Sequence, residues 1–289
     1  MQRESGVGSL GVSELLVSYL REDIRTGDIT SESLLPKITA RARIIAKEGG
    51  VVAGIEELVT LFRLSNCIIR NPVPDGSEIS TGTVICTVEG DVKDLLRTER
   101  VGLNILARMS GVATITRQFV DKARAVNENV KIAATRKTTP GFRYFEKKAV
   151  RIGGGDPHRY SLDDMVLIKE NHIRACGGVT EILKLAGEKI PFSKKIDIEV
   201  ETLDQFREAL RFAPDIIMLD NMKPSEAKEC REHLDKIMPT RSGRTLIEIS
   251  GNITMENVAD YAPYGDIISV GSLTHSYKSL DFTMLMDLQ

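Results

Sequence analysis

The chain of 289 residues contains no tryptophan, and aromatic residues of all kinds make up only 5% of it. Its four cysteines show no Cys-x-x-Cys spacing, so the sequence indicates neither a zinc site nor a disulfide framework and favours reduced thiols. No apolar run reaches the roughly 20 residues that a membrane-spanning helix needs. The first residues also lack the basic and apolar regions of a signal peptide. We therefore expect a soluble, cytoplasmic protein.

Net charge is also small, because 39 Lys and Arg stand against 41 Asp and Glu, giving −2 at pH 7. A chain without an overall basic surface is not expected to bind nucleic acid or a membrane. The segment from Arg136 to Arg174 departs from this balance, with nine cationic side chains against five acidic ones. This local excess of positive charge predicts an anionic ligand.

The first hundred residues mix helix and strand patterns, which indicates an α+β arrangement. A long helical pattern follows at 92–126, and we expect an interruption near Ser110-Gly111. The patterns before it are helical at 13–22 and 55–64, and strand-like with turns at 38–54 and 67–90.

After the long helix, short apolar runs alternate with helix-like segments, as in parallel strands joined by helical crossovers. Six such units favour an α/β barrel, closed or partly open, over an open doubly wound sheet. The expected strands are 130–134, 164–168, 196–200, 215–219, 245–249 and 266–270. The helices expected between them are 141–151, 178–189, 202–212, 224–237 and 254–261.

Each expected barrel strand ends in polar or glycine residues, and barrel active sites lie at these carboxyl ends. The cationic side chains there can bind several carboxylates or phosphates, because arginine binds them in bidentate fashion and lysine supplies a compact charge. Two carboxylates are suited to hold Mg²⁺ or the hydroxyls of a sugar. The donors are Arg136, Lys137, His158, Arg159 and Lys169, and the carboxylates are Glu201 and Asp220.

The turns at Ser250-Gly251-Asn252 and at Gly271 resemble the phosphate-binding loops of barrels. Thr135 and Ser272 are further polar residues at strand ends, with His275 close by, and we expect all of these to contribute to substrate binding.

Three neighbouring features have ordinary explanations. Arg143, Lys147 and Arg151 recur every four residues on an expected helix, which favours a solvent-exposed face over a role near phosphates. Glu199 precedes Glu201 by two residues and points the same way on a strand, and we favour Glu201 because it ends the run. His172 is expected to hydrogen-bond its own loop.

A set of motifs resembles the quinolinate phosphoribosyltransferase family in order and spacing, from about residue 14 to 282. Many members have a histidine where this chain has Asp156-Pro157, a departure that leaves His158 and Arg159 in place. The matching motifs are ATRKTTPG, GGGDPHR, MVLIKENHI, IEVE, MLDNMKP, ISGNIT and VGSLTHS, and ERVGLNILARMSGVAT resembles that family's helix.

The resemblance implies an N-terminal α/β sandwich domain at 1–112, joined by 276–289, and an incomplete, open α/β barrel at 113–275. It implies that quinolinate and 5-phosphoribosyl 1-diphosphate give nicotinate mononucleotide, diphosphate and CO₂, with Mg²⁺, in de novo NAD biosynthesis. The catalytic residues would be Lys137, Lys169, Glu201 and Asp220.

The resemblance also implies a homodimer, or a larger homo-oligomer of dimers. Arg100 would cross the dimer interface to contact quinolinate in the partner's barrel. Two alternatives stay open from the sequence: a paralogue of the same fold associated with molybdenum transport, and a non-catalytic barrel that binds phosphorylated metabolites. The paired carboxylates beside a cationic cluster argue against the second.

Overall fold

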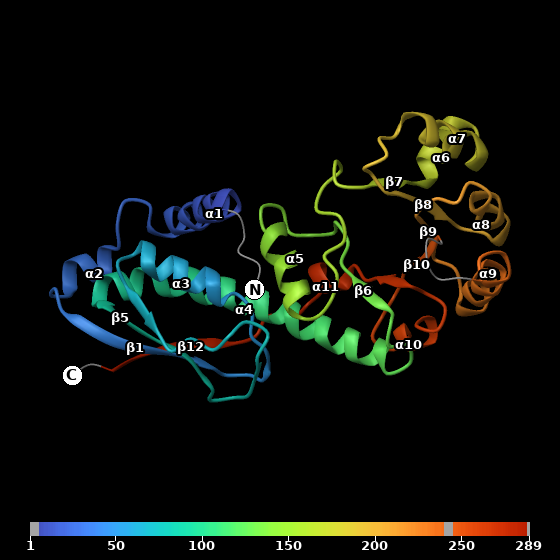
Figure 1. Cartoon of the computed structure of the whole chain (residues 1–289). Coiled ribbons are helices and arrows are strands. Elements are labelled where there is room, and N and C mark those ends of the chain that lie inside the picture. Colours follow the sequence, from blue (N-terminus) through green and yellow to red (C-terminus); the bar gives the residue numbers. More distant parts are fainter. Residues whose placement is uncertain (1–5, 240–244, 288–289) are drawn as a thin grey trace. The chain divides into compact units, whose positions relative to one another are not determined.

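The computed structural model describes residues 6–239 and 245–287 (Figure 1). They form two compact units. One holds the described residues up to Thr114 together with those from Lys278 onward, and the other is Ile115–Tyr277. Within the described ranges no helix is both long and apolar enough to cross a membrane. The four cysteines are free thiols in this structure.

An antiparallel four-stranded sheet with helices packed on it forms the first unit. Apolar residues alternate along β1, and its buried face packs against α3 and the first half of α4 in one core. The strand order is β12 (Phe282–Asp287), β1 (Thr39–Ala46), β5 (Val84–Asp91) and β3 (Ile68–Arg70). The remaining elements are α1 (Gly6–Ile24), α2 (Ile29–Leu34), α3 (Ile55–Leu64), α4 (Val92–Arg124) and the short pair β2 (Gly50–Val51) and β4 (Glu78–Ile79).

Helix α4 is continuous, so the expected interruption at Ser110-Gly111 was wrong. These two small residues instead allow close approach by other segments. The Ser110 hydroxyl accepts a hydrogen bond from the Ala53 N–H at 3.0 Å. A Cβ at position 111 would lie 2.3 Å from the Lys278 carbonyl oxygen, so only glycine fits there.

A six-stranded parallel sheet forms the second unit, with the order β6-β11-β10-β9-β8-β7. From β7 to β11 neighbours in space are neighbours in sequence, and β6 pairs with β11, which is the order of a barrel. A doubly wound sheet would reverse direction. Because β6 and β7 do not pair, the barrel is open, and the predicted fold class is confirmed. The strands are β6 (Lys131–Ala133), β7 (Val166–Ile168), β8 (Ile196–Val200), β9 (Ile216–Asp220), β10 (Leu246–Ser250) and β11 (Ile267–Ser269).

Helices connect these strands, and most begin where the sequence predicts. Thr202 caps α8, because its hydroxyl accepts the Gln205 N–H at 3.2 Å. The short helices α6 and α11, as well as strand β12, were not predicted. The helices are α5 (Arg143–Ile152), α6 (Glu170–Cys176), α7 (Val179–Lys189), α8 (Leu203–Leu210), α9 (Pro224–Ile237), α10 (Val258–Tyr261) and α11 (Ser272–His275).

The chain before β7 pairs with the free edge of β6. The Asp156 N–H donates to the Ile132 carbonyl at 2.8 Å, and the Ala134 N–H donates to the Asp156 carbonyl at 2.9 Å. Pro157 has no N–H and ends this pairing. The departure from the family pattern at Asp156-Pro157 therefore lies directly where the chain turns from the edge of β6 toward His158 and Arg159.

Candidate functional site

Alternate residues of the barrel strands face the interior, because side chains on a strand alternate with a period of two. Asp197, Glu248 and Ser269 are three of these inward-facing residues: Glu248 accepts the Ser269 hydroxyl, and carboxylate oxygens of Asp197 and Glu248 lie within 4.8 Å of each other. We call these three residues the middle layer. Two residues further along, about 6.6 Å at the usual rise per residue, the strands carry Glu199, Asp220, Ser250 and Gly271. The middle layer is polar, whereas barrel interiors are usually filled by branched apolar side chains.

A pocket of about 490 Å³ lies at the carboxyl ends of these strands. It brings together most of the residues predicted from the sequence: Thr135, Arg136, Lys137, His158, Arg159, Lys169, Asp220, Ser250, Gly251 and Asn252. Its lining also includes Glu199, Asn221, Glu248 and Ser269, which were not predicted.

Glu201 does not line this pocket, and the preference for it over Glu199 is corrected by the structure. Glu201 is exposed beyond the end of β8, where its N–H donates to the Gln205 side chain at 2.8 Å. Glu199 lines the pocket and forms an ion pair with Lys169. The physical reason is that β8 ends at Val200, so the last inward-facing position on the strand is Glu199.

The loop after β11 lies beside Lys137 without lining the pocket. A Cβ on Gly271 would lie 3.2 Å from Cδ of Lys137 and 3.0 Å from Nε2 of His275. The Thr274 hydroxyl donates to the Lys137 carbonyl at 2.7 Å. Gly271, Ser272 and His275, at the start and end of α11, are thus placed next to a pocket lysine.

Left-handed backbone conformations cluster at the ends of β9 and β10. Asn221, Gly251 and Asn252 have φ values of 56°, 93° and 51°. The Asn252 side chain donates to the Asn221 side chain at 3.0 Å, which donates to Asp220 at 3.0 Å. Strained conformations of this kind gather at ligand sites, and here they accompany the hydrogen bonds that hold Asp220.

The cationic side keeps unused hydrogen-bonding capacity. The Nε of Arg136 is buried without a partner among the described residues. A buried donor left unsatisfied is costly, so an anionic ligand that accepts from it would be favoured. His172 behaves as predicted for a loop residue, since its Nδ1 accepts the Lys169 N–H at 2.9 Å.

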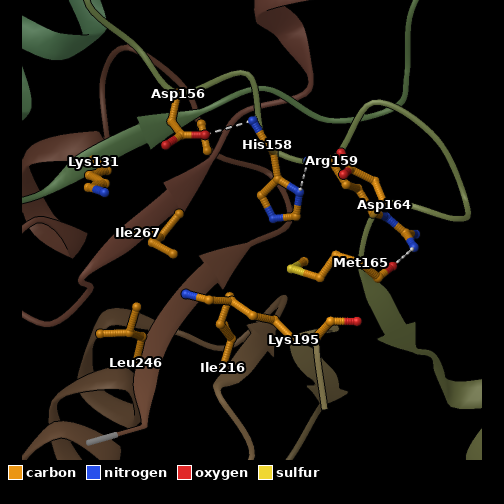
Figure 2. Close-up of a pocket in the computed structure, with 12 residues that line it drawn as sticks. Lys131, Asp156, His158, Arg159, Asp164, Met165, Lys195, Ile216, Leu246 and Ile267 are labelled. Carbon is orange, nitrogen blue, oxygen red and sulfur yellow. Dashed lines mark hydrogen bonds between the residues drawn. The ribbon is translucent and has the colours of Figure 1, made fainter. Parts of the chain in front are cut away.

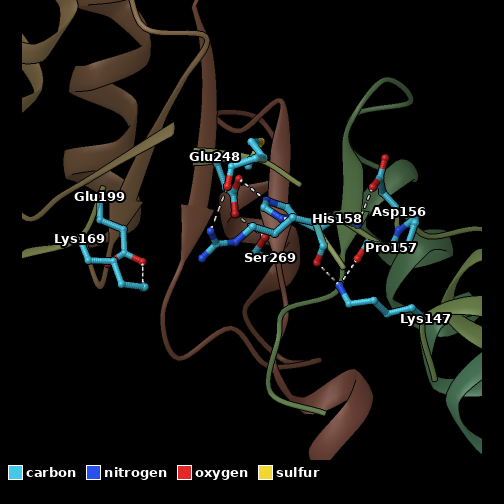
Figure 3. A network of polar contacts seen from close by, with 10 residues as sticks. Lys147, Asp156, Pro157, His158, Lys169, Glu199, Glu248 and Ser269 are labelled. Carbon is cyan, nitrogen blue, oxygen red and sulfur yellow. Dashed lines mark hydrogen bonds and ion pairs between the residues drawn. The ribbon is translucent and has the colours of Figure 1, made fainter. Parts of the chain in front are cut away.

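Lys147 is completely buried, so its predicted exposure on the face of α5 was wrong. Its ammonium donates to the carbonyls of Pro157 and, at 2.8 Å, of Arg159 (Figure 3). Burial, reinforced by the nearby Arg143 charge, lowers the pKa of Lys147 to about 8. This lysine therefore holds the loop that carries His158 and Arg159.

The ring of His158 connects this loop to the middle layer. Its Nε2 lies 3.1 Å from Glu248, whose other carboxylate oxygen accepts the Ser269 hydroxyl (Figure 3). Its Nδ1 accepts the Arg159 N–H at 2.8 Å. A backbone N–H can only donate, so Nδ1 is unprotonated and the hydrogen is on Nε2. His158 is thus a neutral donor to Glu248.

Asp197 lies beside this pair without a hydrogen-bond partner for either carboxylate oxygen in the described structure. Burial, and then the charges of Glu248 and Glu199, raise its pKa. His158, Asp197 and Glu248 place potential ligand atoms within 4.8 Å of one another, as a metal site would. The tautomer of His158 argues against a metal, because the Nε2 lone pair needed for coordination carries a proton instead.

Arg100 belongs to the first unit, on α4. Its side chain is exposed and forms no ion pair with the residues that the structure describes.

Comparison with known proteins decides the family. The chain matches the quinolinate phosphoribosyl transferase N-terminal domain over residues 28–110 and the C-terminal domain over residues 112–285. The chain belongs to the quinolinate phosphoribosyltransferase family. Relatives that are 35–44% identical to this chain carry the name nicotinate-nucleotide pyrophosphorylase [carboxylating], several of them marked as probable.

One relative, the probable nicotinate-nucleotide pyrophosphorylase [carboxylating] of Methanocaldococcus jannaschii, is 44% identical over 94% of this chain and 95% of its own length. The nicotinate-nucleotide pyrophosphorylase [carboxylating] of Homo sapiens is 35% identical over 94% of this chain and 91% of its own. The crystal structure of NadC from Streptococcus pyogenes superimposes with a TM-score of 0.90 at 36% identity and covers 99% of both chains. The similarity thus extends over both units.

Proposed function

We propose that this chain is a nicotinate-nucleotide pyrophosphorylase (carboxylating). It transfers phosphoribosyl from 5-phosphoribosyl 1-diphosphate to quinolinate, with loss of CO₂. The observation that supports this best is the strand-end pocket, which combines Arg136, Lys137, Arg159 and Lys169 with the carboxylates of Glu199 and Asp220 in a member of this family. A passive phosphate binder has little use for carboxylates at that place, so this observation favours an enzyme.

In the proposed complex, Arg136 and Arg159 bind the two carboxylates of quinolinate, since guanidinium groups match carboxylates in bidentate fashion. Lys137 and Lys169 lie where the acceptor meets the ribosyl donor. The donor's phosphate lies against the loops at Gly251-Asn252 and Gly271, where backbone N–H groups are available. His158 donates its Nε2 hydrogen to Glu248, so it lines the pocket as a neutral ring and does not supply positive charge to the substrate.

The pyridine nitrogen of quinolinate forms a bond to C1 of the ribose as the bond from C1 to the diphosphate oxygen breaks. The leaving diphosphate takes that electron pair, and the lysines stabilise the charge that develops on it. Holding both reactants in place supplies a large part of the rate. The positively charged ring then accepts the electrons released as CO₂ departs from C2, and C2 takes up a proton.

The test is formation of nicotinate mononucleotide from quinolinate and 5-phosphoribosyl 1-diphosphate, with nicotinate as the control acceptor. We expect product and CO₂ in equal amounts from quinolinate and little product from nicotinate, which lacks the second carboxylate. Turnover of nicotinate alone, or of neither acid, would contradict the proposal.

The pocket also suits Mg²⁺. Glu199 and Asp220 face one space, and Mg²⁺ in phosphate-handling sites binds one or two protein carboxylates together with substrate phosphates and water. A bound Mg²⁺ would neutralise charge on the diphosphate. Asp220 is the better ligand of the two, because its partner is a neutral asparagine, whereas Glu199 pairs with Lys169.

We expect EDTA to abolish turnover and added Mg²⁺ to restore it. Asp220→Asn should raise the Mg²⁺ concentration needed for half-maximal rate by about tenfold or more, since one charged ligand is lost. Steady-state rates across a Mg²⁺ titration provide the measurement. Full activity without any divalent ion would contradict the metal's role.

Glu199→Gln and Glu201→Gln make a matched pair on one strand. Glu199→Gln should lower kcat/KM by about 10- to 100-fold, because it removes the partner of Lys169 and a pocket charge. Glu201→Gln should stay within about twofold of the wild type, as expected of an exposed residue that makes no contact in the pocket. The reverse order of effects would restore Glu201 as the functional carboxylate.

We also propose that the active form is a homodimer in which Arg100 reaches the partner's pocket. Its guanidinium is exposed and forms no ion pair within the part of the chain that the structure describes, which leaves it available. Arg100→Ala and Lys137→Ala chains should each be inactive, and mixing them should restore up to about a quarter of wild-type activity, since half of the dimers are mixed and each has one competent site. If subunits exchange, as checked by mass spectrometry, and no activity returns, Arg100 does not act across an interface.

A further inference from the structure

A second cavity lies at the other end of the barrel strands from the pocket described above (Figure 2). Its volume is about 320 Å³. Since the strands are parallel, their first inward-facing residues share one edge of the sheet, and these residues line the cavity. They are Lys131, Met165, Lys195, Ile216, Leu246 and Ile267.

The wall of this lower cavity combines an apolar surface with two free cations. Ile216, Leu246 and Ile267 supply the apolar part, and Figure 2 draws Lys195 extended across the same space. Neither Lys131 nor Lys195 forms an ion pair with any residue that the structure describes. A surface of this kind attracts an anion that also has an apolar body.

Two carboxylates also line the lower cavity, but both are already engaged. Asp156 accepts the His158 N–H at 2.7 Å, and Asp164 accepts the Tyr160 N–H at 2.9 Å. Their negative charges would repel a dianion or a polyphosphate more than a monoanion.

His158 and Arg159 separate the two cavities, because both residues line both of them. The guanidinium of Arg159 donates to the carbonyl of Met165, a residue of the lower cavity, at 3.1 Å. His158 has a left-handed backbone, with φ of 53°. A molecule in the lower cavity that contacts His158 or Arg159 would therefore change the position of the Arg159 side chain in the strand-end pocket.

We infer that the lower cavity binds a small monocarboxylate with an aromatic or branched apolar body, and that its occupancy alters quinolinate affinity through Arg159. The ligand's carboxylate lies between Lys131 and Lys195, and its body lies against Ile216, Leu246 and Ile267. The coupling rests on the proposed function, whereas binding at the lower cavity does not.

The first test uses 4-fluorobenzoate and the full chain, with binding measured by ¹⁹F NMR titration. Three proteins should bind it equally: the wild type, the variant Lys137→Ala in the strand-end pocket, and the exposed control Lys184→Ala. Lys131→Ala/Lys195→Ala should bind about tenfold more weakly, having lost both cations. An absence of binding to the wild type, equal binding by the double variant, or a similar loss in Lys137→Ala would overturn the site.

The second test measures quinolinate affinity by calorimetry with and without saturating 4-fluorobenzoate. We expect a change of about threefold or more in the wild type, and the same factor in the affinity for 4-fluorobenzoate when quinolinate is saturating, because coupling is reciprocal. The change should vanish in Lys131→Ala/Lys195→Ala. An unchanged quinolinate affinity in the wild type would overturn the coupling while leaving the result of the ¹⁹F titration in place.

Discussion

Arg159→Ala should weaken quinolinate binding by about 2–5 kcal/mol, the usual cost of removing one member of a buried, hydrogen-bonded charge pair. In affinity this is a loss of roughly 30- to 4,000-fold. Arg159 is only 8% exposed, so after its removal water has little access to the carboxylate that it would bind. Its removal also takes positive charge away from Asp197 and Glu248, which lie in the same layer. Calorimetric titration of quinolinate measures the effect directly.

A purely structural effect of this variant can be separated from lost binding. Arg174→Ala is the matched control, because that arginine is exposed and, among the described residues, forms an ion pair only with Glu170 on its own helix. Arg159→Lys should keep the charge but lose bidentate geometry, and so fall between the alanine variant and the wild type. If Arg159→Ala keeps its melting temperature and binds quinolinate as tightly as the wild type, Arg159 does not bind the acid.

The fold was largely predictable because its signals are local. Six apolar runs with intervening helix patterns identify parallel strands, and their polar ends identify the pocket edge. Whether the sheet closes depends on the β6–β7 gap, which no short pattern encodes. The short helices α6 and α11 were missed for a similar reason, since helices of four and seven residues are too short to show a clear periodicity.

The candidate site was predictable at its rim and not in its interior. Arg136, Lys137 and Lys169 follow strand ends, where loop position alone marks them. Glu248 sits in the middle of an apolar run, and its polar partners come from segments far away in sequence. Glu199 could have been found from the sequence, because the expected strand 196–200 is the strand observed and Glu199 is its last inward-facing position. Glu201 was favoured because it follows the apolar run directly, and that criterion does not test whether the residue still belongs to the strand.

Lys147 shows most clearly why such contacts escape sequence reasoning. Its spacing with Arg143 and Arg151 matches an exposed helix face, and only the tertiary structure brings the carbonyls of Pro157 and Arg159 to its ammonium. Burial of a charge is tolerated here because two carbonyl oxygens and the ring of Tyr160, whose centroid is 5.5 Å away, surround it.

Lys147→Ala should accordingly lower the free energy of unfolding by about 3–5 kcal/mol, since it leaves a cavity and two buried carbonyls without a donor. Lys147→Met should cost less, because it keeps the volume and removes the buried charge. Both should weaken quinolinate binding, as the loop bearing His158 and Arg159 loses its anchor. Denaturant titrations and calorimetry measure the two effects, with Lys184→Met as the exposed control.

The difference in stability between the wild type and Lys147→Met should depend on pH, and this dependence tests whether the Lys147 charge is desolvated. The pKa of Lys147 falls from its ordinary 10.5 to about 8 in the folded chain, so between these values the unfolded chain binds more protons at this residue. Stability contributed by Lys147 therefore rises with pH across that window and is flat below it. The difference in unfolding free energy between wild type and Lys147→Met should shift in favour of the wild type from pH 8 to 10. A difference that is constant over this range would mean that Lys147 keeps an ordinary pKa, and that its charge is not desolvated in the folded protein.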